Sequence, residues 1–186
     1  MWAHGIMGKK VLDLFSGDGS VAKRLSELGY EVVTVDINPR HRPSIVVDII
    51  KWRYQETFPK GHFDLIVGRI PPEALNYFQR KNVVDHYGQM ANRFMEIVKY
   101  FGPKRWWMEV EVDHGSSSRP TLKKLPFCEV DYCKFSKCVC SKRVRIFGST
   151  EIGTLSSVLC TDGSCPNILV TWDGKREHKD HCLWDN

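Results

Sequence analysis

The sequence predicts an α/β fold in which helices cover both faces of a doubly wound, mostly parallel sheet of seven strands. A short apolar run at residues 9–15 ends in the turn Ser16-Gly17-Asp18-Gly19, which is typical of a buried parallel strand. Residues 20–28 then carry apolar side chains at helical spacing, and a β-branched run follows at residues 31–36. Such strand–helix alternation indicates a doubly wound sheet, whose ligands lie outside the carboxyl ends of the strands.

The later elements are predicted from their own patterns. Gly29 is the expected end of the first helix, since glycine readily follows a helix in the left-handed conformation. Residues 81–101 are expected to form a second long helix, with an apolar stripe at Phe94, Ile97, Val98 and Phe101. Beyond residue 148 the composition changes to Gly, Ser, Cys, His and Asp, so we expect an α/β domain at 1–148 and a loop-rich tail at 149–186. The strands are expected at residues 9–15, 31–36, 44–47, 63–67, 105–112, 128–135 and 143–147.

The composition of the chain limits the classes of protein to which it can belong. A chain of 186 residues with 42% hydrophobic and 26% charged residues is long enough for one globular core. No apolar run approaches the roughly 20 residues of a membrane span, and residues 1–7 lack a signal-peptide pattern. The net charge of +5 permits contact with nucleic acid without requiring it. Seven cysteines, an odd number, favour thiols or metal ligands over a disulfide framework.

Six stretches occur in an order and spacing that resembles the DNA cytosine-5 methyltransferases, in pattern the short enzymes of large DNA viruses and phages. The resemblance spans residues 9–148 and implies the Rossmann-like fold of class I methyltransferases that use S-adenosylmethionine (SAM). Residues 106–110 stand where the family has Glu-Asn-Val, and residues 142–146 resemble its Arg-x-Arg strand. The other motifs are residues 11–20, Val35-Asp36-Ile37, Val47-Asp48-Ile49, and residues 63–67 followed by Pro71-Pro72.

The glycine turn also fits the G-x-G-x-x-A pattern of dinucleotide-binding proteins, so a dehydrogenase is an alternative. Asp13 favours SAM over NAD, because an acid just before the turn would repel a pyrophosphate. The resemblance implies that Asp36 binds the ribose hydroxyls and Asp48 the adenine amino group; ordinary strand-end capping is the competing reading of both acids. The full cofactor set that it implies is Asp13, Phe15, Ser16, Gly17, Gly19, Asp36, Ile37, Asp48, Ile49, Gly68 and Pro71.

The resemblance fails at Glu73, where the family has the nucleophilic cysteine of its Pro-Cys pair. A carboxylate is a poor substitute for a thiolate that must attack C6 of a pyrimidine. Glu109 stands where the family's glutamate holds the base, and Arg143 and Arg145 match its arginine pair. The implied catalytic set is therefore Glu109, Arg143 and Arg145 without a nucleophile, unless Cys138 or Cys140 has taken over that role.

The tail carries cysteine and histidine at a density that suits a tetrahedral zinc site. Their irregular spacing leaves reduced thiols as the alternative. The ligands expected for zinc are Cys160, Cys165, His178 and Cys182.

Three functions are compatible with these patterns. The first is a SAM-binding relative of the cytosine-5 methyltransferases that is catalytically impaired or a pseudoenzyme. The second is an active nucleic-acid methyltransferase with an unusual nucleophile or acceptor, and the third is a nucleic-acid or protein-binding module that retains the fold. Residues 149–186 are too few for the family's target-recognition region, so sequence-specific reading of DNA by this chain alone is not expected. DNA is a possible partner, and a protein partner is expected if the chain is inactive. We expect an intracellular protein, in the cytoplasm, nucleus or a virus factory, with no membrane association and no secretion.

Overall fold

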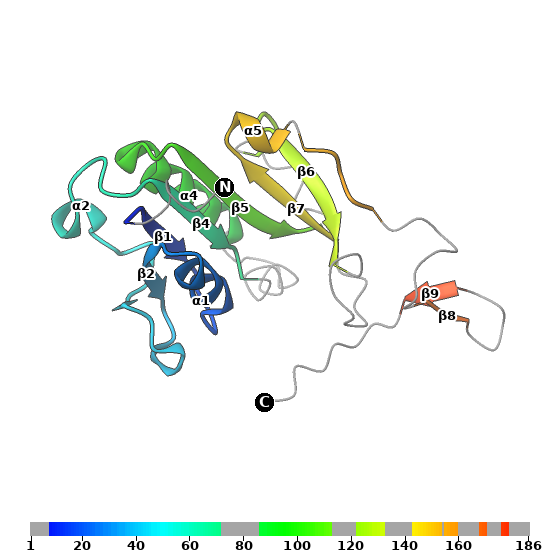
Figure 1. The fold of residues 1–186 in the computed structure, drawn as a ribbon, viewed down its shortest axis with the longest axis horizontal. Helices are drawn as coiled ribbons and strands as arrows, with labels where there is room; N and C mark the ends of the chain where they lie inside the picture. Colours follow the sequence, from blue (N-terminus) through cyan, green and yellow to red (C-terminus); the bar gives the residue numbers. More distant parts are fainter. Residues whose placement is uncertain are drawn as a thin grey trace.

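The computed structural model describes residues 8–71, 86–112, 122–132, 143–153, 155–159, 168–170 and 176–178. Within this part of the chain, seven strands form one sheet in the order β3-β2-β1-β4-β5-β7-β6 (Figure 1). The strands are β1 (Lys10–Leu14), β2 (Glu31–Asp36), β3 (Ile45–Val46), β4 (Leu65–Arg69), β5 (Arg105–Glu111), β6 (Phe127–Asp131) and β7 (Arg143–Gly148).

The first five strands are parallel, with β1 between β2 and β4. Strand β7 runs antiparallel to both β5 and β6, so β6 again points in the direction of β5. The carboxyl ends of β1, β2, β4, β5 and β6 therefore lie along one edge of the sheet. In open α/β sheets this is the edge that holds ligands.

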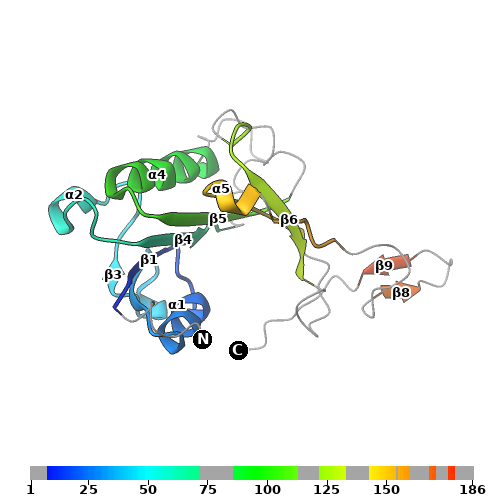
Figure 2. The ribbon, with the colours of Figure 1, turned by 45° about the horizontal axis from the view of Figure 1, so that its top comes forward.

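Two helices cover opposite faces of the sheet, α1 (Ser20–Glu27) on one and α4 (His86–Phe101) on the other (Figure 2). Alternation along the strands divides the buried side chains between these faces. Leu12, Ile66 and Met108 join Phe94 of α4 in the main core cluster. The smaller cluster under α1 joins Val11, Leu25, Leu65 and Val67.

Short elements complete the described part of the chain: η1 (Pro39–His41), α2 (Tyr54–Thr57), α5 (Thr150–Gly153), β8 (Ile168–Val170) and β9 (Arg176–His178). Strands β8 and β9 pair with each other as a hairpin apart from the seven-stranded sheet (Figure 1). Residues 155–159 run beside β6, where the backbone N–H of Asp131 donates to the Val158 carbonyl at 2.9 Å and that of Val158 to the Glu129 carbonyl at 2.9 Å.

The predicted fold class is confirmed, and each of the seven expected strands is present within a few residues of its expected bounds. The expected long helix is observed as α4 from residue 86, and residues 81–85 lie outside the described part. Helix α1 ends at Glu27 and is followed by Gly29 with φ 87°, as predicted. Among the helices that the structure describes, none combines the length and the apolar character needed to cross a membrane. The division of the chain at residue 148 stays a prediction.

Candidate functional site

The turn after β1 is hydrogen-bonded to the carboxyl end of β2. Gly17 and Gly19 have φ angles of 51° and 76°, a left-handed conformation that glycine adopts without strain. The backbone N–H of Gly17 donates to Oδ2 of Asp36 at 2.8 Å, and that of Ser16 donates to the carbonyl of Val35 at 3.1 Å. These contacts bring the first two predicted cofactor motifs together, 19 residues apart in the chain.

The carboxylate of Asp36 has accepting capacity left after its internal contacts. It accepts one hydrogen bond on each oxygen, from the backbone N–H groups of Gly17 and Asn38, both at 2.8 Å. Nδ1 of His41 lies 3.7 Å from Oδ1, beyond hydrogen-bond distance. A carboxylate offers about four lone-pair sites, so further donors can be accommodated. Asp48 accepts from the backbone N–H of Ile50 at 3.0 Å. Both acids thus cap local backbone, and this role leaves room for a ligand.

Asp13 is the most unusual residue of the described part. Its side chain is 3% exposed, and its Oδ2 has no hydrogen-bond partner. Burial, reinforced by the negative charges of Asp36 and Asp18, raises the pKa of Asp13 from 3.8 to about 7. A buried carboxylate oxygen without a donor is costly, because it has lost its water without gaining a hydrogen bond. A cationic or hydrogen-bond-donating ligand would supply the missing partner.

The turn offers little to a pyrophosphate. The backbone N–H of Gly19 donates to the carbonyl of Ser16 at 2.9 Å, and that of Ser20 to Oδ1 of Asp18 at 3.0 Å. The N–H of Gly17 is taken by Asp36. The N–H groups that cradle phosphate at the start of a helix in dinucleotide-binding proteins are therefore directed at internal acceptors. Geometry and charge both disfavour NAD at this edge.

The remaining predicted cofactor residues differ in what they expose. Ile37 is 66% exposed beside Asp36, and Phe15 is half-buried against the main core. Ile49 is buried in that core, which leaves its backbone as the part able to meet a ligand. Gly68 is buried, and a Cβ built on it would lie 2.7 Å from the carbonyl oxygen of Leu14, so strand packing alone requires glycine there. Pro71 is the last residue described before the gap at residues 72–85.

A second polar centre lies at the ends of β4, β5 and β6. The hydroxyl of Tyr132 donates to Oε1 of Glu109, and Nε of Arg69 lies 3.2 Å from the same oxygen. Nη2 of Arg69 donates to Oε1 of Glu111 at 3.0 Å. Burial, with the charge and hydrogen bond of Glu109, raises the pKa of the Tyr132 phenol well above its usual range. Of this group, the sequence analysis identified Glu109 alone; Arg69 and Tyr132 belong to no motif.

The arginine pair predicted for catalysis does not join Glu109. Phe147 packs in the main core, so Arg143 and Arg145, four and two residues away on β7, share the face of α4. Arg143 contacts Asp131 through two hydrogen bonds, of 2.8 and 3.0 Å, and Arg145 contacts Glu129. Met108 and Val110 are also in that core, so Glu109 between them projects to the opposite face.

Several predicted residues lie outside the described part of the chain. They are Glu73, Cys138, Cys140, Cys160, Cys165 and Cys182; for His178 the structure describes the backbone in β9 alone. Among the described residues there is no group of three or more His, Cys, Asp or Glu side chains that could hold a metal ion.

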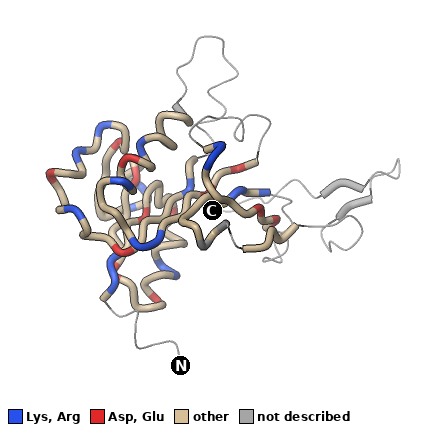
Figure 3. The backbone as a smooth tube through the Cα atoms, turned by 90° about the horizontal axis from the view of Figure 1, so that it is seen from above, with Lys and Arg blue, Asp and Glu red and all other residues tan. Residues whose placement is uncertain are grey.

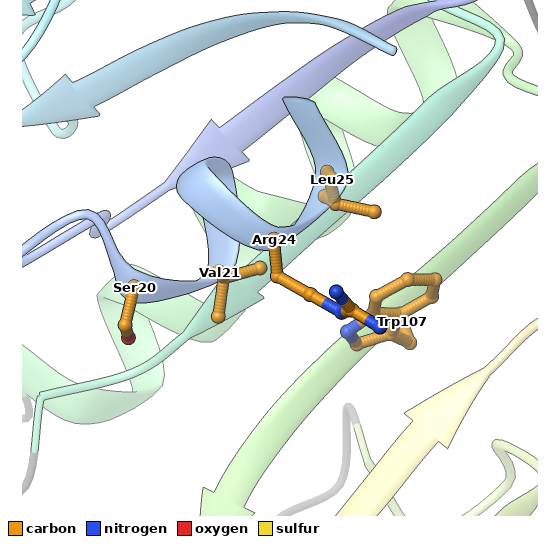
Figure 4. Close-up of a pocket in the computed structure, with 5 residues that line it drawn as sticks. All are labelled: Ser20, Val21, Arg24, Leu25 and Trp107. Atoms are coloured by element: carbon orange, nitrogen blue, oxygen red, sulfur yellow. The ribbon is translucent and has the colours of Figure 1, made fainter. Parts of the chain in front are cut away.

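Two surface features complete the description. An open hollow of about 320 Å³ lies between α1 and β5, lined by Ser20, Val21, Arg24, Leu25 and Trp107 (Figure 4). Lysine and arginine positions are interspersed with acidic positions along the described backbone (Figure 3). A shallow apolar hollow and a mixed surface charge do not by themselves identify a ligand.

The sequence matches no protein-family model and no curated protein. Among solved structures, a candidate DNA modification methyltransferase encoded within an E. coli prophage is 16% identical, over 75% of this chain and 46% of that chain, with a TM-score of 0.54. The chain therefore spans less than half the length of that protein. A TehB-like SAM-dependent methyltransferase from Corynebacterium glutamicum is 16% identical, over 78% and 82% of the two chains, with a TM-score of 0.48. At such identities a likeness shows the fold alone, and this fold is the class I, Rossmann-like fold of SAM-dependent methyltransferases.

Proposed function

We propose that this chain binds SAM, or its demethylated product S-adenosylhomocysteine, at the edge formed by β1, β2 and β3. The observation that carries the proposal is the buried carboxylate of Asp13, near the end of β1, whose Oδ2 has no hydrogen-bond partner. The methionine part of SAM carries an ammonium group, which would pair with this carboxylate. A pyrophosphate would be repelled there and would find the N–H groups of the turn already in use.

The other contacts follow from the ends of the strands. Asp36 retains capacity for the two ribose hydroxyls, and Asp48 for the adenine amino group. The exposed side chain of Ile37, beside Asp36, would cover one face of the adenine ring, and Phe15 the other. When bound, SAM supplies an activated methyl group.

We further propose that methyl transfer by cytosine-5 chemistry is impaired in this chain, because Glu73 replaces the cysteine that the reaction needs. The separation of Glu109 from Arg143 and Arg145 on opposite faces supports the same proposal. The chain then acts through the bound cofactor and a partner, which is DNA or another protein. An active nucleic-acid methyltransferase with a different nucleophile is the second candidate, favoured by the polar centre around Glu109.

Zinc binding by the tail is a separate proposal, supported by the composition of residues 160–182. It predicts about one equivalent of zinc in protein purified without a histidine tag and a lower melting temperature after chelation. Metal-free protein with unchanged stability would exclude it.

Calorimetric titration with SAM tests the cofactor proposal, and β2 provides a matched pair of variants. Asp36→Ala removes the acid at the ligand edge, whereas Glu31→Ala removes the exposed acid at the other end of the same strand. We expect Asp36→Ala to weaken binding by roughly 1.5–3 kcal/mol, as for the loss of a charge-assisted acceptor, and Glu31→Ala to leave it unchanged. Absence of binding to the folded wild type at millimolar SAM would refute the proposal. A radiolabelled methyl-transfer assay on DNA and RNA distinguishes an inactive protein from an active methyltransferase.

A further inference from the structure

Three strands bring a second set of polar side chains to the ligand edge. Arg69 ends β4, Glu109 lies near the end of β5, and Tyr132 follows β6. Because β5 and β6 point in the same direction, these positions meet at one edge although β7 lies between them. Tyr132 thus reaches past β7 to Glu109 on the face of α1.

Both contacts to Glu109 use the same oxygen. The Tyr132 hydroxyl donates a hydrogen bond to Oε1, and Arg69 Nε lies 3.2 Å from it in an ion pair that is not an aligned hydrogen bond, whereas no described residue donates to Oε2. The other end of the guanidinium is held by Glu111 at 3.0 Å. A guanidinium fixed between two carboxylates cannot rotate freely, so it fixes the orientation of Glu109 as well. The side chain of Glu109 is 20% exposed, so a ligand at this edge can reach it.

The electrostatics of the centre indicate what such a ligand must offer. Two carboxylates face one guanidinium, and Tyr132 stays neutral because burial and Glu109 raise its pKa. An ionised carboxylate oxygen only accepts hydrogen bonds, so Oε2 of Glu109 favours a ligand with an N–H or O–H donor.

We propose that Arg69 and Tyr132 are positioning residues that hold Oε1 of Glu109 and leave Oε2 to accept one N–H or O–H group of the molecule that meets the cofactor. This inference rests on the proposed function, since it places an acceptor molecule next to the bound cofactor. It assigns the role of contacting Glu109 to Arg69 of β4, whereas the resemblance implied Arg143 and Arg145 of β7 as the arginines of the site. The ligand class is a compound that carries an amino, amide or hydroxyl donor.

Binding of two matched nucleosides to protein saturated with S-adenosylhomocysteine tests the proposal. Cytidine carries an exocyclic amino group, and N4,N4-dimethylcytidine has no N–H at that position. We expect wild-type protein to bind cytidine about tenfold more tightly, as for one hydrogen bond to a charged acceptor. Tyr132→Phe and Arg69→Gln should each lose most of this preference, while the exposed-site controls Arg24→Gln and Glu31→Gln keep it.

A proton NMR measurement detects the positioning contact itself. The Tyr132 hydroxyl proton should give a slowly exchanging downfield resonance that Glu109→Gln abolishes and Arg24→Gln preserves. Calorimetry with S-adenosylhomocysteine tests the proposed cofactor binding separately. All these variants should bind S-adenosylhomocysteine with the affinity of the wild type. Equal affinity for the two nucleosides in the wild type, or an unchanged preference in Tyr132→Phe and Arg69→Gln, would overturn the inference even if the cofactor binds. Failure of the wild type to bind the cofactor would instead refute the proposed function, and the hydroxyl resonance would still report on the pairing.

Discussion

Replacing Asp13 by asparagine is expected to stabilise the protein and to weaken the binding of SAM. The substitution keeps the shape of the side chain and removes its charge. In the wild type the carboxylate is 3% exposed, and burial, Asp36 and Asp18 raise its pKa from 3.8 to about 7. The fold therefore holds the Asp13 proton more tightly than the unfolded chain does, and ionised Asp13 opposes folding.

The sign and size of the effect follow from this difference in pKa. Stability from this group is fully present below pH 3.8, is lost as the pH rises towards 7, and is constant above that. A rise in the pKa of Asp13 from 3.8 to about 7 corresponds to a loss of about 4 kcal/mol in the free energy of unfolding. The unfolding free energy of Asp13→Asn, relative to wild type, should therefore grow by about 4 kcal/mol between pH 3.5 and pH 8.5.

Urea unfolding at several pH values measures this difference, and Glu31→Gln, an exposed acid on β2, serves as the control. Calorimetry at pH 8 should show that the stabilised Asp13→Asn protein binds SAM at least tenfold more weakly, because the ammonium group loses its ionic partner. A damaged fold cannot explain higher stability combined with weaker binding. A constant stability difference between variant and wild type across this pH range would refute the account of Asp13.

Three further outcomes are expected. Wild-type protein should form no covalent adduct with DNA that contains 5-fluorocytosine, whereas Glu73→Cys should form a trace; peptide mapping of any wild-type adduct would identify another nucleophile. Gly68→Ala should lower the unfolding free energy by about 1–3 kcal/mol, since its Cβ would meet the carbonyl oxygen of Leu14 at 2.7 Å. Arg145→Leu should destabilise by about 1–3 kcal/mol, because Glu129 loses its partner, and should leave the affinity for DNA unchanged in a binding assay.

The sheet was predictable because each strand carries its own pattern. Residues 31–36 and 105–112 alternate or cluster apolar residues in ways that require no knowledge of their neighbours. The helices α2 and α5 were not predicted, since four residues are about one turn and show no periodicity. Residues 155–159, expected to lie in a loop-rich tail, run beside β6, where the backbone of Val158 and the hydroxyl of Ser157 supply the contacts. Backbone pairing of this kind leaves no mark in the side-chain sequence.

The two halves of the candidate site also differ in how far they could be predicted from the sequence. Asp13 and Asp36 lie at the carboxyl ends of the parallel strands β1 and β2, and Gly17 follows β1, so their meeting at one edge could be predicted. The surroundings of Glu109 depend on the insertion of β7 between β5 and β6 and on its register. A change of one residue in register reverses the face of every side chain, so Arg145 could not be placed from sequence alone.

The cost of Asp13 separates the candidate functions on physical grounds. A module that keeps this fold for its surface gains nothing from a buried carboxylate that destabilises it near neutral pH. Such a charge is balanced when a ligand brings the opposite charge to it, and binding then restores the stability that the empty fold lacks. Local rules are broken most often at functional sites. The position of Asp13, just before the glycine turn at the ligand edge, therefore favours cofactor binding over a purely structural role. This conclusion holds whether or not the chain transfers the methyl group.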